Sequence, residues 1–595
     1  MTNTTKRFSR SSVAIAALSA AALALAGCGS GGDDSGDEGG GGEDSGGTIT
    51  IAEVNEVTGF NDVSSAGNLD MNGKLAYLTR SSFTYLDAEL NILPDESFGT
   101  MTVDSEDPLT VTYTMNEDVV WSDGDAIDAD DMLLAWAVQS AYYNDATTDE
   151  EGEVVSGTSY FDYAGDTSGL ALTDFPEISE DNRSLTITYS EPFADYQLVE
   201  LIDQPVHVVA EGAGTTVEEL RAAFEEAPRG DADAPAEANA TIKAAADFWN
   251  TGFDATELPS DESLYLSSAA FVVDSWDPGQ SMTLVRNEAY VGDQVPDYDS
   301  LVIRFVGDSA AQVTALQNGD VDIIAPQPSR DTLTGLEALG NATTLTGDQF
   351  SYDHLDLNFN SPVFADPVVR EAFMKVVPRQ QILESIITPL NPEAEIYDSQ
   401  LFFPGTDGYD RAIEANGSDA YAEPDIEGAR ELLAGATPTI RILYNTENPN
   451  RVDSFTAISA AATEAGFIIE DLGSPDWSSL LPGGDYDASI FGWISSGVGV
   501  TGVPQIFGTE GGGNYSGYSN PEADALMDEL IVELDTDAQV DLQLEIENLI
   551  WGDFYGLPLF VGPGVAAYAD RVTGVVYNPG QIGNVWNFWE WTVSS

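Results

Sequence analysis

An α/β fold divided over two or three domains is predicted by three features of this sequence. The 595 residues are more than one hydrophobic core commonly organises. The composition, 43% hydrophobic and 10% aromatic, is typical of a packed globular protein. In the second half of the chain, strand-like runs at 439–444, 467–472 and 486–493 alternate with a helical run from about Val452 to Ala465. That alternation predicts a β-α-β unit with parallel strands.

Residues 1–27 have the pattern of an export signal. Lys6, Arg7 and Arg10 form a basic start, and Val13–Ala26 is an apolar stretch too short to span a membrane comfortably. We therefore expect the rest of the protein to lie outside the cytoplasm.

Cys28 follows the export signal directly and is the only cysteine of the protein. Its position after Leu25-Ala26-Gly27 resembles a bacterial lipobox, and this resemblance implies that Cys28 becomes the lipidated N-terminus. The alternative is ordinary cleavage near the same place, with the cysteine incidental. Because there is a single cysteine, we expect no internal disulfide.

Residues 28–47 form a predicted tether. Every residue from Gly29 to Gly47 is Gly, Ser, Asp or Glu, so the segment offers nothing that could be buried in a core. As a flexible coil it would span about 25 Å, and charge repulsion would extend it further. A lipid, a tether and large domains together indicate a protein held on the outer, extracellular face of the cytoplasmic membrane.

The charge balance of the chain limits its partners. It has 20 Lys and Arg against 102 Asp and Glu, a formal net charge of −82. Such a surface repels nucleic acid phosphates and anionic lipid headgroups, so DNA and RNA binding are excluded. Self-repulsion favours solubility over stability and is screened by salt, which makes a saline habitat one hypothesis for the composition. We expect a monomer.

Candidate strands in the first half have alternating or continuous apolar patterns bounded by turn residues. They are Thr48–Ala52, a pair that begins near Asp107 with 108–115 and continues from Val119, Leu185–Tyr189, a pair around the turn 277–279, Ser300–Val306 and Val321–Ile324.

Helices in the same half are marked by capping residues. Asp128 and Asp131 form a capping pair, and Thr216 begins a capping box within a helical stretch over 210–260. Ser309 is predicted to cap a further helix.

In the second half, Asp366-Pro367 starts a helix with an apolar face, and two more helices are predicted at 521–534 and 537–551. The chain then ends in several strands and a tryptophan-rich segment.

The stretch from Asp485 to Leu526 is a candidate for ligand contact. A strand ends at Trp493 and leads into a Ser/Gly/Val segment without a charge, then into the flexible run Gly511–Gly513. A polar cap and a proline, Asn520-Pro521, start the next helix. Small side chains leave backbone N–H and C=O groups open to a ligand. The alternative is a plain surface loop between a strand and a helix.

Motifs for catalysis or metal binding are missing from the sequence. It has no G-x-S-x-G motif for a serine nucleophile and no H-E-x-x-H motif for zinc, and its only histidines are His207 and His354. The acidic cluster at 123–131 lacks the spacing of a calcium loop. We expect no metal, no cofactor and no enzymatic activity, and interpret His354 as structural. An extracellular hydrolase built on a carboxylate pair stays an alternative, as does a passive surface protein.

Eight short motifs occur in a fixed order along the chain. They are VVWSDGDAIDADDMLLAW (119–136), YSEPF (189–193), LVRNEAY (284–290), AAQVTALQNGDVDI (310–323), HLDLN (354–358), DPVVREAF (366–373), DYDASIFGW (485–493) and NYSGYSNPEADAL (514–526). Together they resemble family 5 of the extracellular solute-binding proteins, the receptors of oligopeptide and dipeptide ABC importers. The resemblance spans nearly all of the chain after the tether.

The resemblance implies a periplasmic-binding-protein-like fold of type II, cluster C, with two α/β lobes and an extra α+β domain inserted into lobe I. Lobe I would comprise 48–350 and 565–595, with the insertion over about 75–204, and lobe II would comprise 351–564. The lobes would close on a peptide or peptide-like small solute, which an ABC permease in the membrane then imports. Other family members bind sugars, opines and metal chelates, so a non-peptide solute is the alternative.

In peptide-binding members of this family, the backbone after Gly-Trp pairs with the ligand like an added strand. The end of the first strand and the loop after the Gly-Trp segment are further candidates. The ligand-contact residues implied in this way are Glu53, Val54, Asn55, Trp493, Ile494, Ser495, Ser496, Asn514 and Tyr515.

The sequence departs from the family pattern directly after Trp493. Peptide binders commonly place an aspartate there to hold the α-ammonium group of the peptide, but residues 494–504 read ISSGVGVTGVP and contain no acid. A free amine is therefore not expected to bind at this point, unless another acid such as Glu53 or Glu56 takes over the role. We expect the identity of the solute to be decided in this segment.

Overall fold

Residues 46–148, 154–406, 408–495 and 497–594 are described by the structure, a computed structural model. The export signal, Cys28, most of the tether and Ser496 lie outside these ranges. Within them, no helix combines the length and the apolar character needed to cross a membrane.

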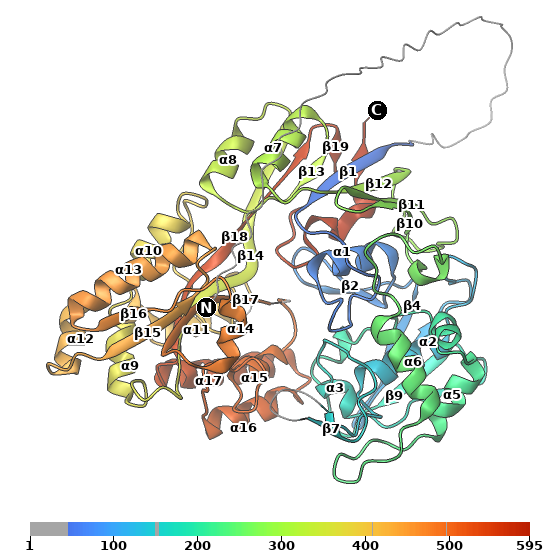
Figure 1. The fold of residues 1–595 in the computed structure, drawn as a ribbon, viewed down its shortest axis with the longest axis horizontal. Coiled ribbons are helices and arrows are strands. Elements are labelled where there is room, and N and C mark those ends of the chain that lie inside the picture. The colour runs from blue at the N-terminus through green and yellow to red at the C-terminus, as the bar shows by residue number, and fades with distance from the viewer. Residues whose placement is uncertain (1–45, 149–153, 407, 496, 595) are drawn as a thin grey trace, which may run out of the picture. The chain divides into compact units, whose positions relative to one another are not determined.

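A mixed sheet of ten strands runs through the described chain (Figure 1). Across the sheet, the strands are β10 (Phe271–Asp277), β11 (Ser281–Arg286), β12 (Ser300–Phe305), β1 (Thr48–Glu53), β13 (Ile323–Ile324), β18 (Gly556–Ala569), β14 (Ala342–Leu357), β17 (Ala488–Ile494), β15 (Thr439–Tyr444) and β16 (Ile468–Asp471). The long strands β14 and β18 therefore lie between a group of strands that precede β14 in the chain and a group that follow it.

The pairing of β14 with β18 changes register part-way along. The antiparallel register is interrupted between Asp348 and Tyr352, opposite Pro563 and Val561. Before the interruption, β14 pairs with β18 alone, and after it β14 also pairs with β17. The interruption thus lies where one group of strands passes into the other.

The predicted β-α-β unit is confirmed. β15 pairs in parallel with both β16 and β17, and helix α13 (Pro449–Ala465) lies between β15 and β16 in sequence. Asn448 caps this helix with its side chain, and Gly466 ends it in a left-handed conformation with φ 114°. β15 thus lies between its two sequence successors.

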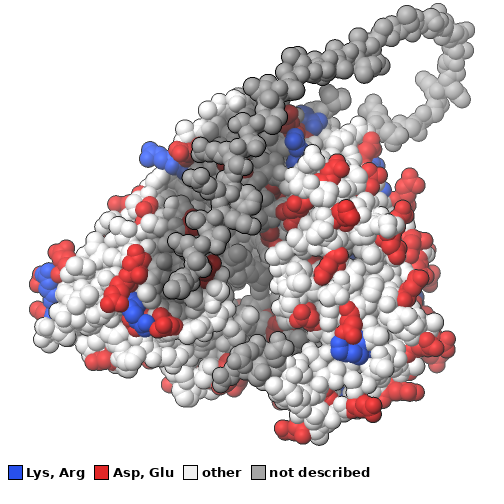
Figure 2. Space-filling view, viewed as in Figure 1, with Lys and Arg blue, Asp and Glu red and all other residues white. Residues whose placement is uncertain are grey.

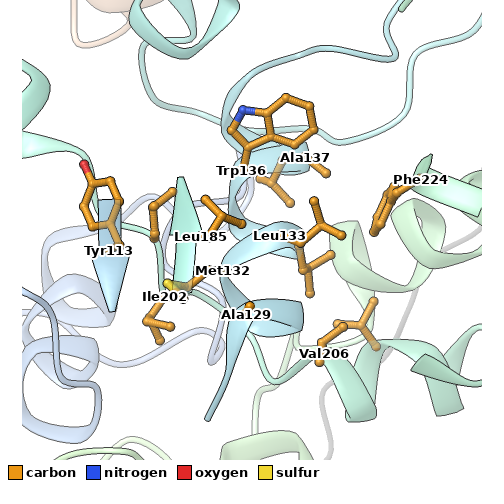
Figure 3. Close-up of a cluster of buried hydrophobic side chains, with 14 of the residues drawn as sticks. Tyr113, Ala129, Met132, Leu133, Trp136, Ala137, Leu185, Ile202, Val206 and Phe224 are labelled. Carbon is orange, nitrogen blue, oxygen red and sulfur yellow. The ribbon is translucent and has the colours of Figure 1, made fainter. Parts of the chain in front are cut away.

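A second, four-stranded antiparallel sheet has the order β4 (Gly99–Glu106), β5 (Leu109–Met115), β9 (Ser184–Thr188), β8 (Glu177–Ile178). Helix α2 (Ala129–Gln139) packs on it, and Figure 3 shows its Leu133 and Trp136 among side chains of β5, β9 and later helices. The indole Nε1 of Trp136 donates to Thr173 Oγ1 at 2.9 Å. This hydrophobic core includes residues up to Phe253.

The predicted partner of strand 108–115 was wrong. β5 pairs with β4 and β9, whereas the residues after Val119 contribute only an isolated bridge from Val120 to Ala126. β4 was missed because it is an edge strand with mostly polar, solvent-facing residues, and therefore lacks a clear apolar alternation.

Most predicted helix starts are confirmed, with one correction. Asp128 and Asp131 form a complete capping box at α2. α7 is capped by Asp308, whose carboxylate accepts from Ala311 N at 2.7 Å, and not by Ser309, which is already helical. The Thr216 side chain caps α5.

The remaining elements are short or lie outside the two sheets. The helices are α1 (Asp70–Thr79), α3 (Ser168–Ala171), α4 (Val206–Gly212), α5 (Val217–Glu226), α6 (Ala240–Thr251), α7 (Ser309–Asn318), α8 (Arg330–Glu337), α9 (Pro367–Met374), α10 (Arg379–Ile386), α11 (Tyr409–Ala415), α12 (Ile426–Leu433), α14 (Trp477–Leu480), α15 (Gly502–Phe507), α16 (Pro521–Leu530) and α17 (Thr536–Gly552). The two-stranded pairs are β2 (Thr84–Leu86) with β3 (Ile92–Pro94), β6 (Thr147–Thr148) with β7 (Val154–Ser156), and β19 (Val572–Thr573) with β20 (Thr592–Val593).

Candidate functional site

A cavity of about 420 Å³ lies beside helix α1. Its walls come from α1, the region of β2, the segments 163–165 and 198–202, and the C-terminal loop 578–586. The volume is within the range of sites for small ligands. Charged, aromatic and apolar side chains line it, among them Asp62, Tyr77, Arg80, Tyr85, Asp95, Tyr163, Leu198, Glu200 and Trp586.

Aromatic side chains form much of the wall and are held in place. The Tyr77 hydroxyl donates to the carbonyl of Trp586 at 2.7 Å, which ties α1 to the C-terminal loop. Tyr85 lies edge-on to Trp589, with ring centroids 5.6 Å apart. Burial and then the nearby acids raise the pKa of Tyr77, so its phenol stays uncharged at neutral pH.

Arg80 is the only cationic residue among the described residues that line the cavity, and it is already neutralised. Its guanidinium forms a short ion pair with Asp62 and lies 3.7 Å from an oxygen of Asp203. Burial lowers the pKa of Arg80, but the two carboxylates raise it more. The carboxyl of Asp203 is buried, which raises its pKa to about 6 despite Arg80.

Glu200 also lines the cavity, and its carboxylate has no hydrogen-bond or ion-pair partner among the described residues. The side chain is accessible from the cavity, while protein atoms crowd it on its other sides. This desolvation raises the pKa of Glu200, Arg80 lowers it, and Asp62 raises it further. The net shift is upward, as expected for a carboxylate without a cation of its own.

The three predicted contact residues at the end of β1 do not line the cavity, and two of them, Glu53 and Asn55, support its wall. Glu53 forms a 2.7 Å ion pair with Lys74 of α1. Asn55 donates to Asp70, at the start of α1, at 2.9 Å. Val54 is half-buried at the strand end. The polar groups of Glu53 and Asn55 are thus used to hold α1.

The predicted segment after Gly492 continues the sheet. Trp493 pairs with Tyr352 and Ile494 with Ser351 of β14, and the Ser495 amide donates to the carbonyl of Phe350 at 2.7 Å. On the other side of β17, β15 ends opposite Ile490. Beyond that point, no backbone partner occupies this edge of β17 within the described chain.

Trp493 and Tyr515 are brought together, while Asn514 serves its own loop. The rings of Trp493 and Tyr515 stack with centroids 5.9 Å apart and planes 10° apart. The indole Nε1 of Trp493 is buried without a hydrogen-bond partner among the described residues. The Asn514 amide donates to the carbonyls of Gly508 and Tyr518, so it shapes the loop instead of projecting from it.

The acid-free segment after Trp493 contacts an acid from far away in the sequence. Asp195, which is 9% exposed, accepts hydrogen bonds from Val500 N, Thr501 N and Thr501 Oγ1 at 2.9–3.0 Å. A β-carbon built on Gly499 would lie 2.9 Å from the Leu198 side chain, which lines the cavity. Sequence reasoning missed this contact, because nothing local in either segment indicates a partner some 300 residues away.

The two histidines do not form an accessible catalytic site. His354 Nδ1 lies 2.6 Å from Asp356, but the two side chains are only 2% and 5% exposed. The other ring nitrogen of His354, Nε2, is buried and has no hydrogen-bond partner among the described residues. His207 lies beside Asp123 and Asp125 on the surface. No group of three potential ligands suitable for a metal occurs within the described residues.

With this geometry established, comparison with known proteins decides the family. The model of the bacterial extracellular solute-binding proteins, family 5 (middle part) matches residues 99–515. The chain belongs to this family. Its members are substrate-binding proteins that work with ABC permeases, so the predicted receptor class is confirmed.

Curated relatives cover most of the chain. The oligopeptide-binding protein OppA of Mycobacterium tuberculosis is 25% identical over 475 residues, which are 77% of this chain and 70% of that protein. An uncharacterized lipoprotein of the same organism is 25% identical over 541 residues, 87% of this chain and 88% of its own length.

Solved structures share the fold of this family 5 protein. The periplasmic EDTA-binding protein EppA has a TM-score of 0.77 at 22% identity and covers 92% of this chain and 97% of its own. The oligopeptide-binding protein AppA from Bacillus subtilis, in complex with a nonapeptide, has a TM-score of 0.67 at 19% identity, covering 92% and 99%. These similarities confirm the predicted type II periplasmic-binding fold.

Proposed function

We propose that this family 5 protein captures a peptide or peptide-like small solute and hands it to an ABC permease. The observation that carries the proposal is the cavity beside α1, whose wall residue Leu198 contacts the segment that follows Trp493. The open edge of β17 at 491–494 offers a solute backbone hydrogen bonds, as in strand addition. Trp493, Ile494, Ser495 and Ser496 are the proposed contacts from this side.

The proposal includes two lobes that move relative to each other. Lobe I comprises 48–350 and 565–595, and lobe II comprises 351–564. The register interruption between β14 and β18 near Asp348 supports a hinge at these limits. One hydrophobic core includes residues from Phe83 to Phe253. This favours an inserted domain that extends beyond residue 204, the approximate limit predicted from the sequence.

A non-peptide solute is the second candidate. EppA, the neighbour with a TM-score of 0.77, is described as EDTA-binding, and residues 494–504 of this chain lack the acid that commonly holds a peptide amine. A hydrolase that uses His354 is disfavoured because the His354–Asp356 pair is buried, with side chains only 2% and 5% exposed. We infer that the protein performs no chemistry on its ligand.

The location belongs to the same proposal. Cys28 is the proposed lipidated residue, and 28–47 the tether that keeps a monomeric receptor beside its permease on the outer face of the membrane. The names of relatives as lipoproteins support this anchor.

The first experiment is a thermal-shift screen of the full chain against di- to octapeptides, sugars, opines and metal chelates. We expect a peptide to raise the Tm and to reduce the radius of gyration in solution scattering, because solute capture stabilises a closed form. A peptide series without effect beside a sugar or chelate that shifts the Tm would reject the peptide assignment. Tight binding without compaction would reject the closing lobes.

A further inference from the structure

The cavity beside α1 has an excess of negative charge that its own residues do not balance. Its single guanidinium, on Arg80, is shared by Asp62 and Asp203. Asp95 also lines the cavity and accepts hydrogen bonds from the loop that follows it. Glu200 has neither a cation nor a hydrogen-bond donor for its carboxylate within the described chain. An anionic group in this cavity would therefore meet carboxylates and an already neutralised arginine.

Aromatic side chains line the same space. Tyr77, Tyr85, Tyr163 and Trp586 contribute to its wall together with Glu200. Tyrosine and tryptophan rings attract a cation over their faces, and a nearby carboxylate strengthens such a site. Two of the rings are held by hydrogen bonds: the Tyr77 hydroxyl donates to the Trp586 backbone carbonyl, and the Trp586 Nε1 donates to the Val576 carbonyl at 3.2 Å. A volume of about 420 Å³ holds a side chain or a small amine and not an extended long peptide.

The other acids near the predicted contact segment are already occupied. Asp195 accepts hydrogen bonds from Val500 and Thr501, and Glu53 forms an ion pair with Lys74. Glu56 accepts from the Gly279 amide at 2.5 Å. Glu200, five residues after Asp195, is the carboxylate that is both accessible from the cavity and free.

We propose that this cavity receives a cationic group of the solute, an ammonium or guanidinium on an apolar stem, with Glu200 as its counter-ion and the aromatic side chains as its walls. The inference rests on the proposed function, because it names the class of solute that the receptor captures. In this proposal, the positive group of the solute binds at the wall of lobe I and not at the acid-free segment after Trp493.

The test compares matched ligands that differ in one charge. One set consists of alanine di- to octapeptides with a single lysine, and the second set carries norleucine in its place. A non-peptide pair, 4-phenylbutylamine and 4-phenylbutanol, accompanies them. Affinities of the full chain are measured by calorimetry at 0.15 M and 0.5 M salt. The variants are Glu200→Gln and, as a matched control, Glu191→Gln, an exposed acid of the same stretch that does not line the cavity.

We expect the charged member of at least one pair to bind about fivefold tighter than the neutral one at both salt concentrations, as for a partly exposed charge pair. Glu200→Gln should bring this ratio close to one, and Glu191→Gln should leave it unchanged. Two results would overturn the inference, because each would reflect the overall charge of the protein. One is a Glu191→Gln variant that reduces the affinity ratio of charged to neutral ligand as much as Glu200→Gln does. The other is an affinity ratio that falls to one at 0.5 M salt.

The remaining outcomes separate the inference from the proposed function. If lysine and norleucine peptides bind equally well, the receptor function stands and the cationic site is rejected. If only the phenylbutylamine pair discriminates, the cationic site stands and the peptide assignment fails. Binding of none of these probes would overturn the inference as stated.

Discussion

Two rings lie nearly parallel to that of Trp493, Tyr515 at 5.9 Å and His354 at 6.4 Å between centroids. Its buried Nε1 has no acceptor among the described residues. A buried indole N–H commonly has a partner, so this Nε1 is an unusual unsatisfied donor. By contrast, the Asn514 amide donates a hydrogen bond within its own loop, and the Glu53 carboxylate forms an ion pair with Lys74. Single residues with free polar atoms are thus better candidates for contact than those with internal partners.

Asp131 allows a prediction at the same scale. Burial raises its pKa to about 7, even though Val206 N, Asp128 N and Trp121 Nε1 donate to it. The folded state therefore binds this proton more tightly than the unfolded state, whose pKa is near 3.8. The resulting stabilisation is complete below about pH 4 and is lost as the pH rises to about 7, by at most about 4 kcal/mol.

Asp131→Asn should remove this pH dependence. The Tm deficit of the variant relative to the wild type should be largest at pH 5 and should shrink towards pH 8, as measured by calorimetry. Asp174→Asn, at an exposed position, should show a difference that does not vary over this range. A deficit for Asp131→Asn that is equally constant would contradict the raised pKa.

At the scale of elements, the contact between 194–198 and 497–501 joins the stretch between β9 and α4 to the segment after β17. It consists of the Asp195 bonds to Val500 and Thr501, with Leu198 packed close to Gly499. Nearby, the Ala194 amide donates to the carbonyl of Ile531 at 2.8 Å. The contact uses backbone donors of a glycine-rich segment, so a single acid serves several of them.

Asp195→Ala should weaken this contact. Loss of the charged acceptor leaves buried amide donors unpaired, at a cost of about 2 kcal/mol. We expect a larger radius of gyration without ligand and a weaker affinity for any solute found in the screen, because fewer molecules hold the arrangement seen here. Asp174→Ala is the control. An unchanged radius together with an unchanged affinity would show that Asp195 only stiffens its own loop.

At the scale of the whole molecule, the main feature is the excess of negative charge, 102 Asp and Glu against 20 Lys and Arg. Figure 2 shows Asp and Glu spread over the visible face, with few Lys or Arg among them. Several cations of the described chain are engaged in ion pairs, as Arg571 is with Asp322 at 2.6 Å and Arg451 with Asp353 at 3.1 Å. The remaining acids repel one another across the surface.

Salt should therefore stabilise the folded protein. Raising NaCl from 0.05 M to 1 M shortens the Debye length from more than 10 Å to about 3 Å, so the Tm should rise by several degrees. Sucrose at matched osmolality controls for solvent exclusion, and NaCl should exceed its effect. A Tm that does not respond to salt would remove the hypothesis of a saline habitat.

The proposed attachment to the membrane also concerns the whole chain. If Cys28 carries a lipid, Cys28→Ser should move the protein from the membrane fraction to the soluble fraction, while Ser30→Ala should leave it attached. Fractionation of cells that express each variant provides the measurement. Retention of Cys28→Ser in the membrane fraction would show that the protein is held by other means.

Much of the fold was predictable because its signals are local. The β-α-β unit at 439–493, the capping box at Asp128 and the Asn520-Pro521 helix start depend on periodicity and on neighbours within four residues. β4 could not be recognised in the same way, since its polar, exposed residues carry no alternation and its place in the sheet depends on β5.

The candidate site was harder to predict. The sequence pointed to the segment after Trp493 and to the end of β1, and the structure places these beside the cavity but not in its wall. The lining residues Tyr77, Glu200 and Trp586 come from three distant segments, and none belongs to a motif. Their importance arises from being close in space and, for Glu200, from a carboxylate without a partner among the described residues.

By itself, then, the sequence determined the family, the α/β class, the negative charge and most helix starts, because composition, periodicity and motif order are properties of the chain. Only the tertiary structure decided which acids are free to meet a solute. Asp195, Glu53 and Glu200 are all acids in the sequence, but two of them are engaged by groups far away in the chain or on another element and one is not. Whether a carboxylate is neutralised depends on its distance in space from a cation or a hydrogen-bond donor, because the attraction between them weakens over a few ångströms. Spacing along the sequence does not give that distance.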